Sequence, residues 1–268
     1  MTGSISEAED LVQDAYVRFD GAADSVEHPR AFLYRTVTRL CLDHLKSARH
    51  RREVYVGPWL PEPVAHPVSD FAHSAVELAD EVGVALLLAL ERLSPLERAV
   101  FVLHDAFDYD YAEVAAVLDS TPAACRQLAS RARAHLKSAR PRFQPAPDEV
   151  QRLVQAVLGA TMAGDADRLT ALLRADATLI SDGGGKAKAA LKSIGGAERI
   201  ARFLVGTMRK NPLPPGATMV PARISGLPGL LVFVGQQCLQ SVALELDGSS
   251  VAAIYIVRNP DKLAHLRP

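Results

Sequence analysis

Two proline-rich stretches divide this chain of 268 residues, and they limit where a continuous helix or central strand can run. The first, VGPWLPEPVAHP at residues 56–67, holds four prolines and the chain's single tryptophan. The second, PRFQPAPDE at residues 141–149, holds three prolines. Proline has no backbone N–H and its ring clashes with the preceding helical turn, so both stretches are predicted to be extended linkers. The predicted organisation is a domain at 1–53, a linker at 54–75, and domains at 76–141 and 148–268.

The residues on either side of the first stretch have helical patterns. SISEAEDLVQDAYVRF, at residues 4–19, places apolar side chains on one face of a helix and acidic side chains on the other. PRAFLYRTVTRLCLDHLKSARHRR, at residues 29–52, begins with a proline, which suits the first turn of a helix. After the linker, an apolar helix is followed by SPLERAVFVLHDAF, with Ser94 as a predicted N-cap. Both N-terminal domains are therefore predicted to be all-α.

The end of the second domain has the layout of a helix-turn-helix. YAEVAAVL is a compact helix, DST a tight connection, and PAACRQLASRARAHL a second helix that opens at Pro122, with Ser120 or Thr121 as its cap. The second helix carries three arginines and a histidine but no acid. In a DNA-binding helix-turn-helix, this second helix enters the major groove.

Positive charge in the first half of the chain is concentrated in two helices. Residues 1–150 hold 16 Lys and Arg against 23 Asp and Glu, yet 13 of these bases lie at 30–52 or 126–142. Asp43 is the only acid within either window. An acidic body would repel phosphate unless these two basic faces were the ones presented. The charge pattern therefore favours a nucleic-acid partner.

The third domain alternates between helices and strands and is predicted to be α+β. Helices are predicted at 149–163, 166–174 and 197–210, and strands at ATLISD and AALKSIG, followed by a curved antiparallel meander from residue 217 onward. The DGGGK string between the first strands is not a phosphate loop. The Walker pattern needs glycine at 180 and Ser or Thr at 187, where this chain has Ile180 and Ala187.

Composition argues against several classes of protein. The chain has no apolar run long enough for a membrane span and no signal-peptide pattern at its start, so a cytoplasmic protein without a membrane partner is predicted. Cys41, Cys125 and Cys238 are odd in number and far apart, which argues against a disulfide framework or a paired-cysteine zinc site. Neither a metal nor a cofactor is predicted.

Three further strings stand beside the helical motifs quoted above: WLPEP at 59–63, DGGGK at 182–186 and NPDKL at 259–263. Together, these strings and helices resemble the extracytoplasmic-function sigma factors of bacterial RNA polymerase, in the subgroup with a fused SnoaL-like domain. The resemblance covers nearly the whole chain. It implies two all-α sigma domains, region 2 and the helix-turn-helix region 4, followed by an α+β cone-shaped SnoaL-like domain.

The resemblance implies that the partners are core RNA polymerase and promoter DNA. Residues implied to contact the polymerase are Asp10, Gln13 and Asp14. Residues implied to open and read the −10 element are Phe32, Tyr34, Arg35, Arg39, Lys46 and Arg49. Residues implied to read the −35 element are Arg126, Gln127, Ser130, Arg131 and Arg133. These residue types suit the task, because strand separation needs cations near an aromatic platform, while arginine and glutamine form paired hydrogen bonds with guanine and adenine.

The three strings are implied to regulate the spacing of the two sigma domains. DGGGK and NPDKL would meet the WLPEP linker, with Trp59 as its anchor, so that no separate anti-sigma factor is required. The interdomain residues implied are Trp59, Leu60, Pro61, Glu62, Pro63, Asp182, Gly183, Gly184, Gly185, Lys186, Asn259, Pro260, Asp261 and Lys262. Family members normally begin with one more helix, so Leu11, Ala15 and Phe19 are expected to lack some packing partners.

Two other functions remain open at this point. The C-terminal fold also resembles that of ketosteroid isomerase and SnoaL cyclases, whose pocket holds an acid such as Asp182, so a small-molecule isomerase, cyclase or ligand sensor is the alternative. The predicted strands are poor in paired acid and base side chains, and enzymatic activity is therefore not expected. A repressor or activator that binds duplex DNA without polymerase is the third class.

Overall fold

The computed structural model describes residues 1–23, 26–53, 55–67, 84–91, 93–136 and 147–268. The chain forms two compact units. The first unit combines residues 1–53 with the described residues between 86 and 136, and the second combines residues 55–67 and 84–85 with residues 147–268. The proline-rich stretch at 56–67 thus packs with the C-terminal domain instead of forming a free spacer. Residues 68–83 and 137–146, where the rest of the predicted linkers and the start of an apolar helix fall, lie outside the described residues.

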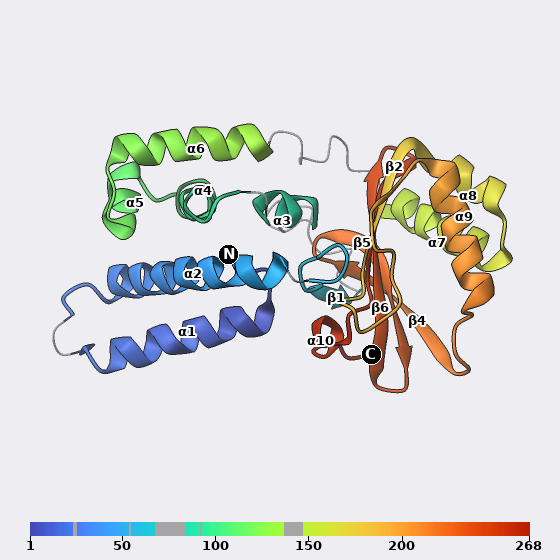
Figure 1. The fold of residues 1–268 in the computed structure, drawn as a ribbon, viewed down its shortest axis with the longest axis horizontal. Coiled ribbons are helices and arrows are strands. Elements are labelled where there is room, and N and C mark those ends of the chain that lie inside the picture. Colours follow the sequence, from blue (N-terminus) through green and yellow to red (C-terminus); the bar gives the residue numbers. More distant parts are fainter. Residues whose placement is uncertain (24–25, 54, 68–83, 92, 137–146) are drawn as a thin grey trace. The chain divides into compact units, whose positions relative to one another are not determined.

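All regular elements among the described residues of the first unit are helices, as predicted (Figure 1). Its elements are α1 (Ile5–Asp20), α2 (Pro29–Glu53), α3 (Val84–Glu91), α4 (Pro95–Val100), the π-helix η4 (Phe101–Ala106), α5 (Tyr111–Leu118) and α6 (Pro122–Leu136). α1 packs along α2, and α4, η4 and α5 pack against α6. Among the described residues, no helix is both long and apolar enough to cross a membrane.

Local side chains determine where the helices of the second domain begin. The Ser94 hydroxyl accepts the backbone N–H of Glu97, and the Glu97 carboxylate accepts the backbone N–H of Ser94. This reciprocal capping box satisfies two N–H groups that a helix start leaves free. At α6 the cap is Thr121, not Ser120, because the Thr121 hydroxyl accepts the backbone N–H of Ala124 at 3.2 Å.

The helix predicted after Ser94 changes its winding at residue 101, where α4 gives way to the π-helix η4. The backbone N–H of Phe107 donates to a carbonyl five residues back instead of four. Within η4, His104 has its ring 4.0 Å from the ring of Tyr111, and its Nδ1 lies 2.6 Å from the carbonyl oxygen of Tyr109. The predicted helix is therefore present, but its second half is a π-helix, and the pattern of apolar residues gave no sign of that change.

The second unit is an α+β domain, which confirms the predicted class. Its helices are α7 (Pro147–Ala163), α8 (Ala166–Leu172), α9 (Ala197–Lys210) and α10 (Pro260–Leu263). Its strands are β1 (Ala65–Pro67), β2 (Leu173–Asp182), β3 (Ile194–Gly195), β4 (Ala217–Ile224), β5 (Leu227–Val234), β6 (Gln237–Asp247) and β7 (Ser250–Val257). The strand predicted at 189–195 is reduced to the two residues of β3.

The strands form one sheet in the order β1-β4-β5-β6-β7-β2-β3. The meander from β4 to β7 is antiparallel as predicted, but β2 pairs with β7 in parallel. The parallel pair arises because the chain leaves β2 through α9 and the meander before β7 returns beside it. The linker contributes β1, which pairs with the edge strand β4. A proline-rich linker was predicted to be extended, but the pairing of Ala65 with Ile224, far along the chain, was not predicted.

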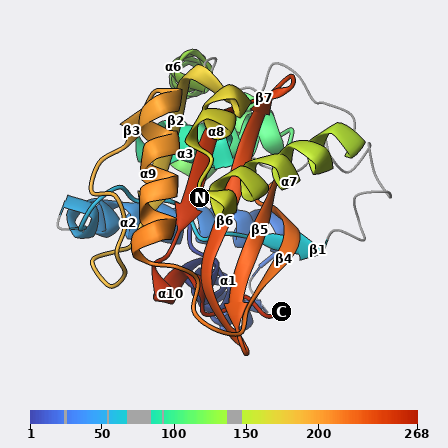
Figure 2. The ribbon, with the colours of Figure 1, turned by 90° about the vertical axis from the view of Figure 1, so that its right-hand side faces the viewer.

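Helices α7, α8 and α9 cover one face of this sheet, while the linker and α10 lie on the other (Figures 1 and 2). The helix-covered face forms a continuous apolar core, because buried side chains of all three helices meet those of β2, β6 and β7. Its fully buried members include Ala160, Leu169, Leu179, Ile200 and Val251. The core holds the sheet rigid and leaves the opposite face to position the linker.

Candidate nucleic-acid interface and linker-binding site

Two arginines of α2, predicted to bind nucleic acid, share one carboxylate. Arg35 Nη2 donates to Oδ1 of Asp119 at 2.9 Å, and Arg39 donates to Oδ2 of the same side chain. Asp119 ends α5 in the left-handed conformation, with φ 50°. Hydrogen bonds from Arg35 and then Arg39 hold the pKa of the Asp119 carboxyl below its usual value. Both arginines are thus ion-paired within the first unit, although about half of each side chain stays exposed.

The two aromatic residues predicted to act beside these arginines point to different neighbours. The ring of Tyr34 meets Tyr109 and Phe107 edge-on, with centroids 5.1 Å and 6.3 Å away. Both partners belong to the loop between η4 and α5. Phe32 instead packs against Phe19 of α1, with ring centroids 6.1 Å apart. Tyr34 therefore packs against the loop before α5, with the Arg30 guanidinium carbon 5.6 Å from its ring centroid, whereas Phe32 takes part in the contact between α1 and α2.

The remaining predicted residues of the first domain lie on α1 and on the last turns of α2. Asp10, Gln13 and Asp14 are all exposed on α1, where a partner could reach them. Lys46 and Arg49 belong to α2, but their side chains lie outside the described residues.

One face of α6 is polar and lies opposite the side that packs against the rest of the second domain. The residues on its buried side are Cys125, Ala129, Ala132 and Leu136. Successive residues of a helix are about 100° apart, which places Gln127, Ser130 and Arg131 roughly opposite that buried side. All three are exposed. These side chains are the ones that a groove of DNA would meet if α6 were inserted into it.

Arg126 and Arg133, also predicted to read DNA, lie at the edge of α6 and contact the preceding helices. Arg133 Nε donates to Asp105 of η4 at 2.7 Å, and an Nη atom donates to the Tyr111 hydroxyl at 3.4 Å. The guanidinium carbon of Arg126 lies 5.9 Å from the centroid of the Tyr111 ring. Such contacts fix the position of a long side chain and, for Arg133, offset its charge. The five predicted residues therefore divide into three outward-facing ones and two anchored ones.

The linker-binding site is centred on a buried carboxylate at the end of β2. Asp182 is 0% exposed, and both of its oxygens accept hydrogen bonds. Oδ1 accepts the Tyr55 hydroxyl at 2.6 Å, while Oδ2 accepts the backbone N–H of Leu60 and the ammonium group of Lys262, each at 2.8 Å. A buried charge is tolerated only with such partners, because leaving water is costly. Asp182 thus connects the linker with α10.

Lys262 completes the hold on the linker backbone. Its side chain is buried, and its ammonium group donates to the Leu60 carbonyl as well as to Asp182. The same group lies 4.1 Å from the centroid of the Trp59 ring and 5.0 Å from that of Tyr55. One ion pair therefore satisfies both the N–H and the C=O of Leu60. Burial, the largest cause, and the hydrogen bond to Asp182 raise the pKa of the Tyr55 phenol, which keeps it protonated as a donor.

The glycines of the DGGGK turn allow the close approach of these segments. A Cβ atom on Gly183 would lie 2.1 Å from the carbonyl oxygen of Ala187. Gly184 has φ +59°, and a Cβ there would lie 2.3 Å from Nδ2 of Asn259, which itself donates to the Tyr55 hydroxyl at 2.9 Å. Gly185 also has a positive φ, +73°. Only glycine combines this backbone conformation with the space available, so the turn, the NPDKL segment and the linker lie in contact.

We expect Gly184→Ala to loosen the linker by more than its backbone strain alone. A left-handed alanine costs about 1–2 kcal/mol, and here its Cβ would also displace Asn259 and Tyr55. The control is Gly235→Ala, with φ +58° and nothing within 4 Å of the added Cβ. Thermal unfolding followed by the fluorescence of the single tryptophan, Trp59, compares them. Equal loss of stability in the two variants would contradict a special role for this turn.

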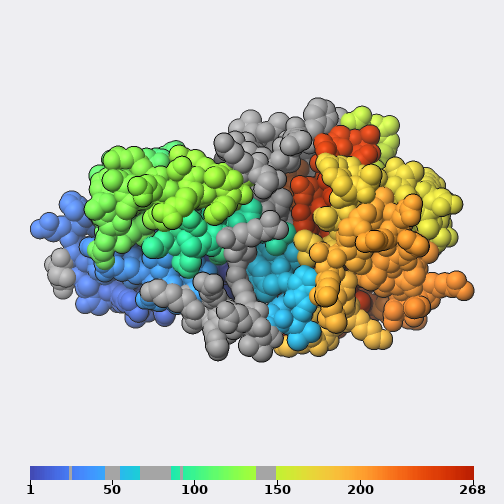
Figure 3. All heavy atoms as spheres, turned by 45° about the horizontal axis from the view of Figure 1, so that its top comes forward, coloured from blue at the N-terminus to red at the C-terminus, as the bar shows by residue number. Residues whose placement is uncertain are grey.

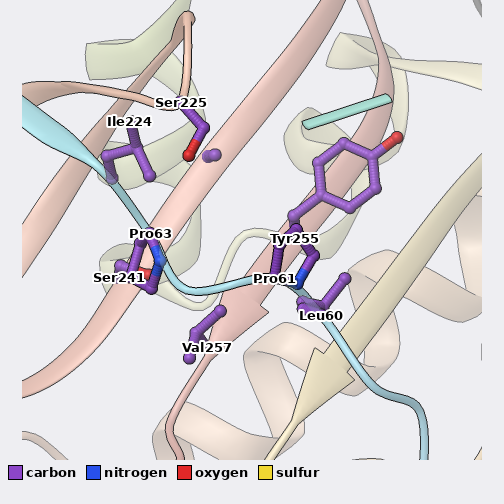
Figure 4. A pocket seen from close by; sticks show the side chains of 9 residues that line it. Leu60, Pro61, Pro63, Ile224, Ser225, Ser241, Tyr255 and Val257 are labelled. Carbon is purple, nitrogen blue, oxygen red and sulfur yellow. The ribbon is translucent and has the colours of Figure 1, made fainter. Parts of the chain in front are cut away.

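The linker fills the hollow of the sheet face opposite the helices. Leu60 is 1% exposed, and only about 10 Å³ of cavity remains beside it, lined also by Pro61, Pro63 and Tyr255 (Figure 4). That volume holds about one water molecule at most. In the space-filling view the cyan linker lies against the yellow part of the same unit (Figure 3). The docked segment thus leaves little free space beside Leu60 on this face of the sheet.

Further hydrogen bonds fix the linker beyond Leu60. Ser225 and Val64 bond twice, since the Ser225 backbone N–H donates to the Val64 carbonyl at 2.6 Å and its hydroxyl accepts the Val64 N–H at 3.2 Å. The Pro63 carbonyl oxygen lies 2.9 Å from Nε2 of His265. Of the remaining predicted residues, Lys186 pairs with Asp261 at the rim, Glu62 is half-buried and Pro260 is exposed.

Sequence reasoning missed several residues of both sites. Tyr55 lies four residues before WLPEP, and Ser225 and His265 belong to no string that stood out, so local pattern gave no reason to select them. Asp119 appeared only as the first residue of the DST connection. Each of these residues has its functional partner far away in the chain. The spacing of residues within one segment cannot indicate such a distant partner.

Comparisons with known proteins cover the whole chain. Residues 1–51 match the family model for sigma-70 region 2, and residues 83–136 match the model for sigma-70, region 4. The chain is 38% identical to the ECF RNA polymerase sigma factor SigJ of Mycobacterium tuberculosis, over 98% of this chain and 87% of that protein. It is 33% identical to the probable ECF RNA polymerase sigma factor SigI of the same species, over 100% of this chain and 90% of the relative.

The fold agrees with a solved structure over the same extent. The crystal structure of the Mycobacterium tuberculosis extracytoplasmic function sigma factor SigJ matches with a TM-score of 0.75 and 34% sequence identity. The match covers 98% of this chain and 91% of that one. The C-terminal α+β domain and the linker are therefore included in the similarity, together with both helical domains.

Proposed function

We infer the roles of the individual residues from the family of the chain. The chain belongs to the extracytoplasmic-function sigma factors of bacterial RNA polymerase. It directs promoter-specific transcription, and core RNA polymerase and promoter DNA are the partners that the family implies. We propose that α6 reads the −35 element through Gln127, Ser130 and Arg131. Arg126 and Arg133 support that helix from its edge, and the protein acts in the cytoplasm.

The observation that carries this proposal is the outward polar face of α6 in a capped helix-turn-helix. Gln127 and Arg131 lie one turn apart and are exposed, and each side chain can form two hydrogen bonds with a single base. On α2, Arg35 and Arg39 supply cations and Tyr34 supplies an aromatic ring, the two kinds of side chain that contact with the −10 element requires. The exposed Asp10, Gln13 and Asp14 on α1 are proposed to face the polymerase.

We propose that the C-terminal domain regulates the two sigma domains and catalyses no reaction. Asp182, the acid that an isomerase would need, has both oxygens engaged by Tyr55, Leu60 and Lys262. The space beside Leu60, about 10 Å³, is too small for a substrate. These features favour a protein-contact role over the isomerase, cyclase or ligand-sensor alternative.

The proposed regulation works through the length of free chain between the sigma domains. Residues 55–67 follow α2 directly in the sequence and are held by Asp182, Lys262 and Ser225. While they are held, they cannot extend; once released, they add to the chain available between region 2 and region 4. Because the holding domain belongs to the same chain, a separate anti-sigma factor is not required under this proposal.

Run-off transcription with purified core polymerase tests the proposal. The template carries the promoter of a neighbouring gene, and the full chain is compared with a chain that ends at residue 146. We expect transcripts that depend on the added chain, and a changed yield from the truncated one. Unchanged transcription after truncation would contradict the regulatory role. Promoter binding by the full chain at equal strength with and without core polymerase would favour an ordinary repressor or activator.

A further inference from the structure

The pair of arginines on α2 has the geometry of a phosphate clamp with a carboxylate in the phosphate's place. Arg35 and Arg39 are one helical turn apart, and each donates to a different oxygen of Asp119. A phosphate group also offers separate oxygens to two guanidinium groups, at a similar charge. The carboxylate comes from a residue 80 positions later than Arg39, in the turn of the helix-turn-helix. The carboxylate of Asp119 thus pairs with the two guanidinium groups of α2 within the same unit.

Local structure does not account for an acid at position 119. The residue adopts φ 50° and ψ 49°, a conformation for which asparagine or glycine is at least as well suited as aspartate. The cap of α6 is Thr121, so the Asp119 carboxylate is not needed to start that helix. The contacts with Arg35 and Arg39 are therefore what the charge of Asp119 contributes within the first unit.

Aromatic contacts join the same part of α2 to the second helical domain. Tyr34, one residue before Arg35, meets Tyr109 and Phe107, and both of these lie in the second helical domain like Asp119. Three side chains of region 4 thus engage the residues of region 2 proposed to handle the −10 element. While these contacts persist, the Nη2 atoms of Arg35 and Arg39 are engaged by Asp119, so a phosphate would have to displace that carboxylate to bind them.

We propose that Asp119 is an internal counter-charge that competes with nucleic-acid phosphate for Arg35 and Arg39, so that region 4 closes the −10-binding face of region 2 in the free chain. The inference rests on the proposed −10 role of the two arginines. The closure is reversible, because exposed ion pairs are individually weak and are screened by salt. The flanking arginines hold the pKa of Asp119 below its usual value, so the counter-charge is present at any physiological pH.

The test measures binding of a mixed-sequence single-stranded oligodeoxynucleotide to the full chain at low salt, without polymerase. We expect Asp119→Asn and Asp119→Gly to bind about two- to tenfold more tightly than the unchanged chain, because both remove the charge and suit the left-handed turn. The slope of log affinity against log salt should steepen by up to about 1.4, as two freed arginines each meet a phosphate. Thermal unfolding verifies that the variants fold.

Asp108→Asn is the matched control. Asp108 is an exposed aspartate with φ 55° in the same unit, and within the part of the chain that the structure describes it forms no ion pair. Its replacement should leave affinity unchanged. If Asp119→Asn binds no more tightly than Asp108→Asn, the counter-charge proposal is wrong.

A second set of variants separates this proposal from the one it rests on. Arg35→Ala with Arg39→Ala should weaken binding of the oligonucleotide, and Asp119→Asn should give no gain in that background. If the double variant binds normally, the proposed −10 role of the two arginines fails. If it binds weakly while Asp119→Asn alone changes nothing, the −10 role stands and the counter-charge is overturned.

Discussion

Replacing Asp182 by asparagine is expected to release the linker and to lower the free energy of unfolding of the C-terminal unit by about 3–5 kcal/mol. The variant leaves the buried Lys262 ammonium group without its counter-charge and weakens the hydrogen bonds to Tyr55 and Leu60. Removing one partner of a buried pair is costly because the remaining charge stays desolvated. Denaturant unfolding followed by Trp59 fluorescence measures the change, and limited proteolysis at residues 55–67 reports release directly.

The matched control is Asp176→Asn, in the same strand. Asp176 pairs with Arg174, but its side chain is 70% exposed, so its loss should leave the unfolding curve nearly unchanged. The double variant Asp182→Asn with Lys262→Met should lose less than the two single variants together, because it leaves no buried charge unpaired. A linker that stays docked in Asp182→Asn would show that apolar packing of Leu60 suffices to hold it.

Replacing the two exposed residues of α6 that are proposed to contact bases, with Gln127→Ala and Arg131→Ala, is expected to abolish most −35-dependent transcription. A paired hydrogen-bond contact with one base contributes about 1–3 kcal/mol, so each loss costs roughly tenfold or more in promoter affinity. Run-off transcription on the promoter of a neighbouring gene, with salt held constant, measures the loss. Thermal unfolding should change little, since both side chains are exposed and lie away from the core.

Arg133→Ala is the informative comparison for this prediction. Arg133 carries the same charge as Arg131, but its guanidinium group donates to Asp105 and Tyr111 beside α6. We expect it to lower thermal stability slightly and transcription much less than Arg131→Ala. A larger loss of transcription from Arg133→Ala than from Arg131→Ala would show that a different face of α6 enters the groove.

Features encoded within a single segment could be predicted from the sequence. The capping box at Ser94, the helix-turn-helix and the glycine turn all follow from neighbouring residues, and the structure contains each of them. The role of Asp182 could be assigned only through family resemblance. Its partners Tyr55 and Lys262 lie 127 and 80 residues away, so no local period connects them.

The features that prediction missed depend on the path of the chain in three dimensions. The parallel pairing of β2 with β7 follows from the intervening helix and meander, and neither strand shows it alone. The contact of Asp119 with Arg35 and Arg39 joins the basic helix α2 to the turn that precedes the second basic helix. The distribution of charge along the sequence indicated both basic helices, but it could not show that an acid already pairs with one of them.

The pairing of β1 with β4 protects the sheet as well as holding the linker. Without residues 65–67, β4 would become the outer strand, and its free N–H and C=O groups could pair with another molecule. A strand exposed in this way is a template for aggregation or strand exchange between copies. The linker therefore covers the edge of the sheet. Any signal that releases the linker for a long time also exposes β4 and favours self-association of the protein.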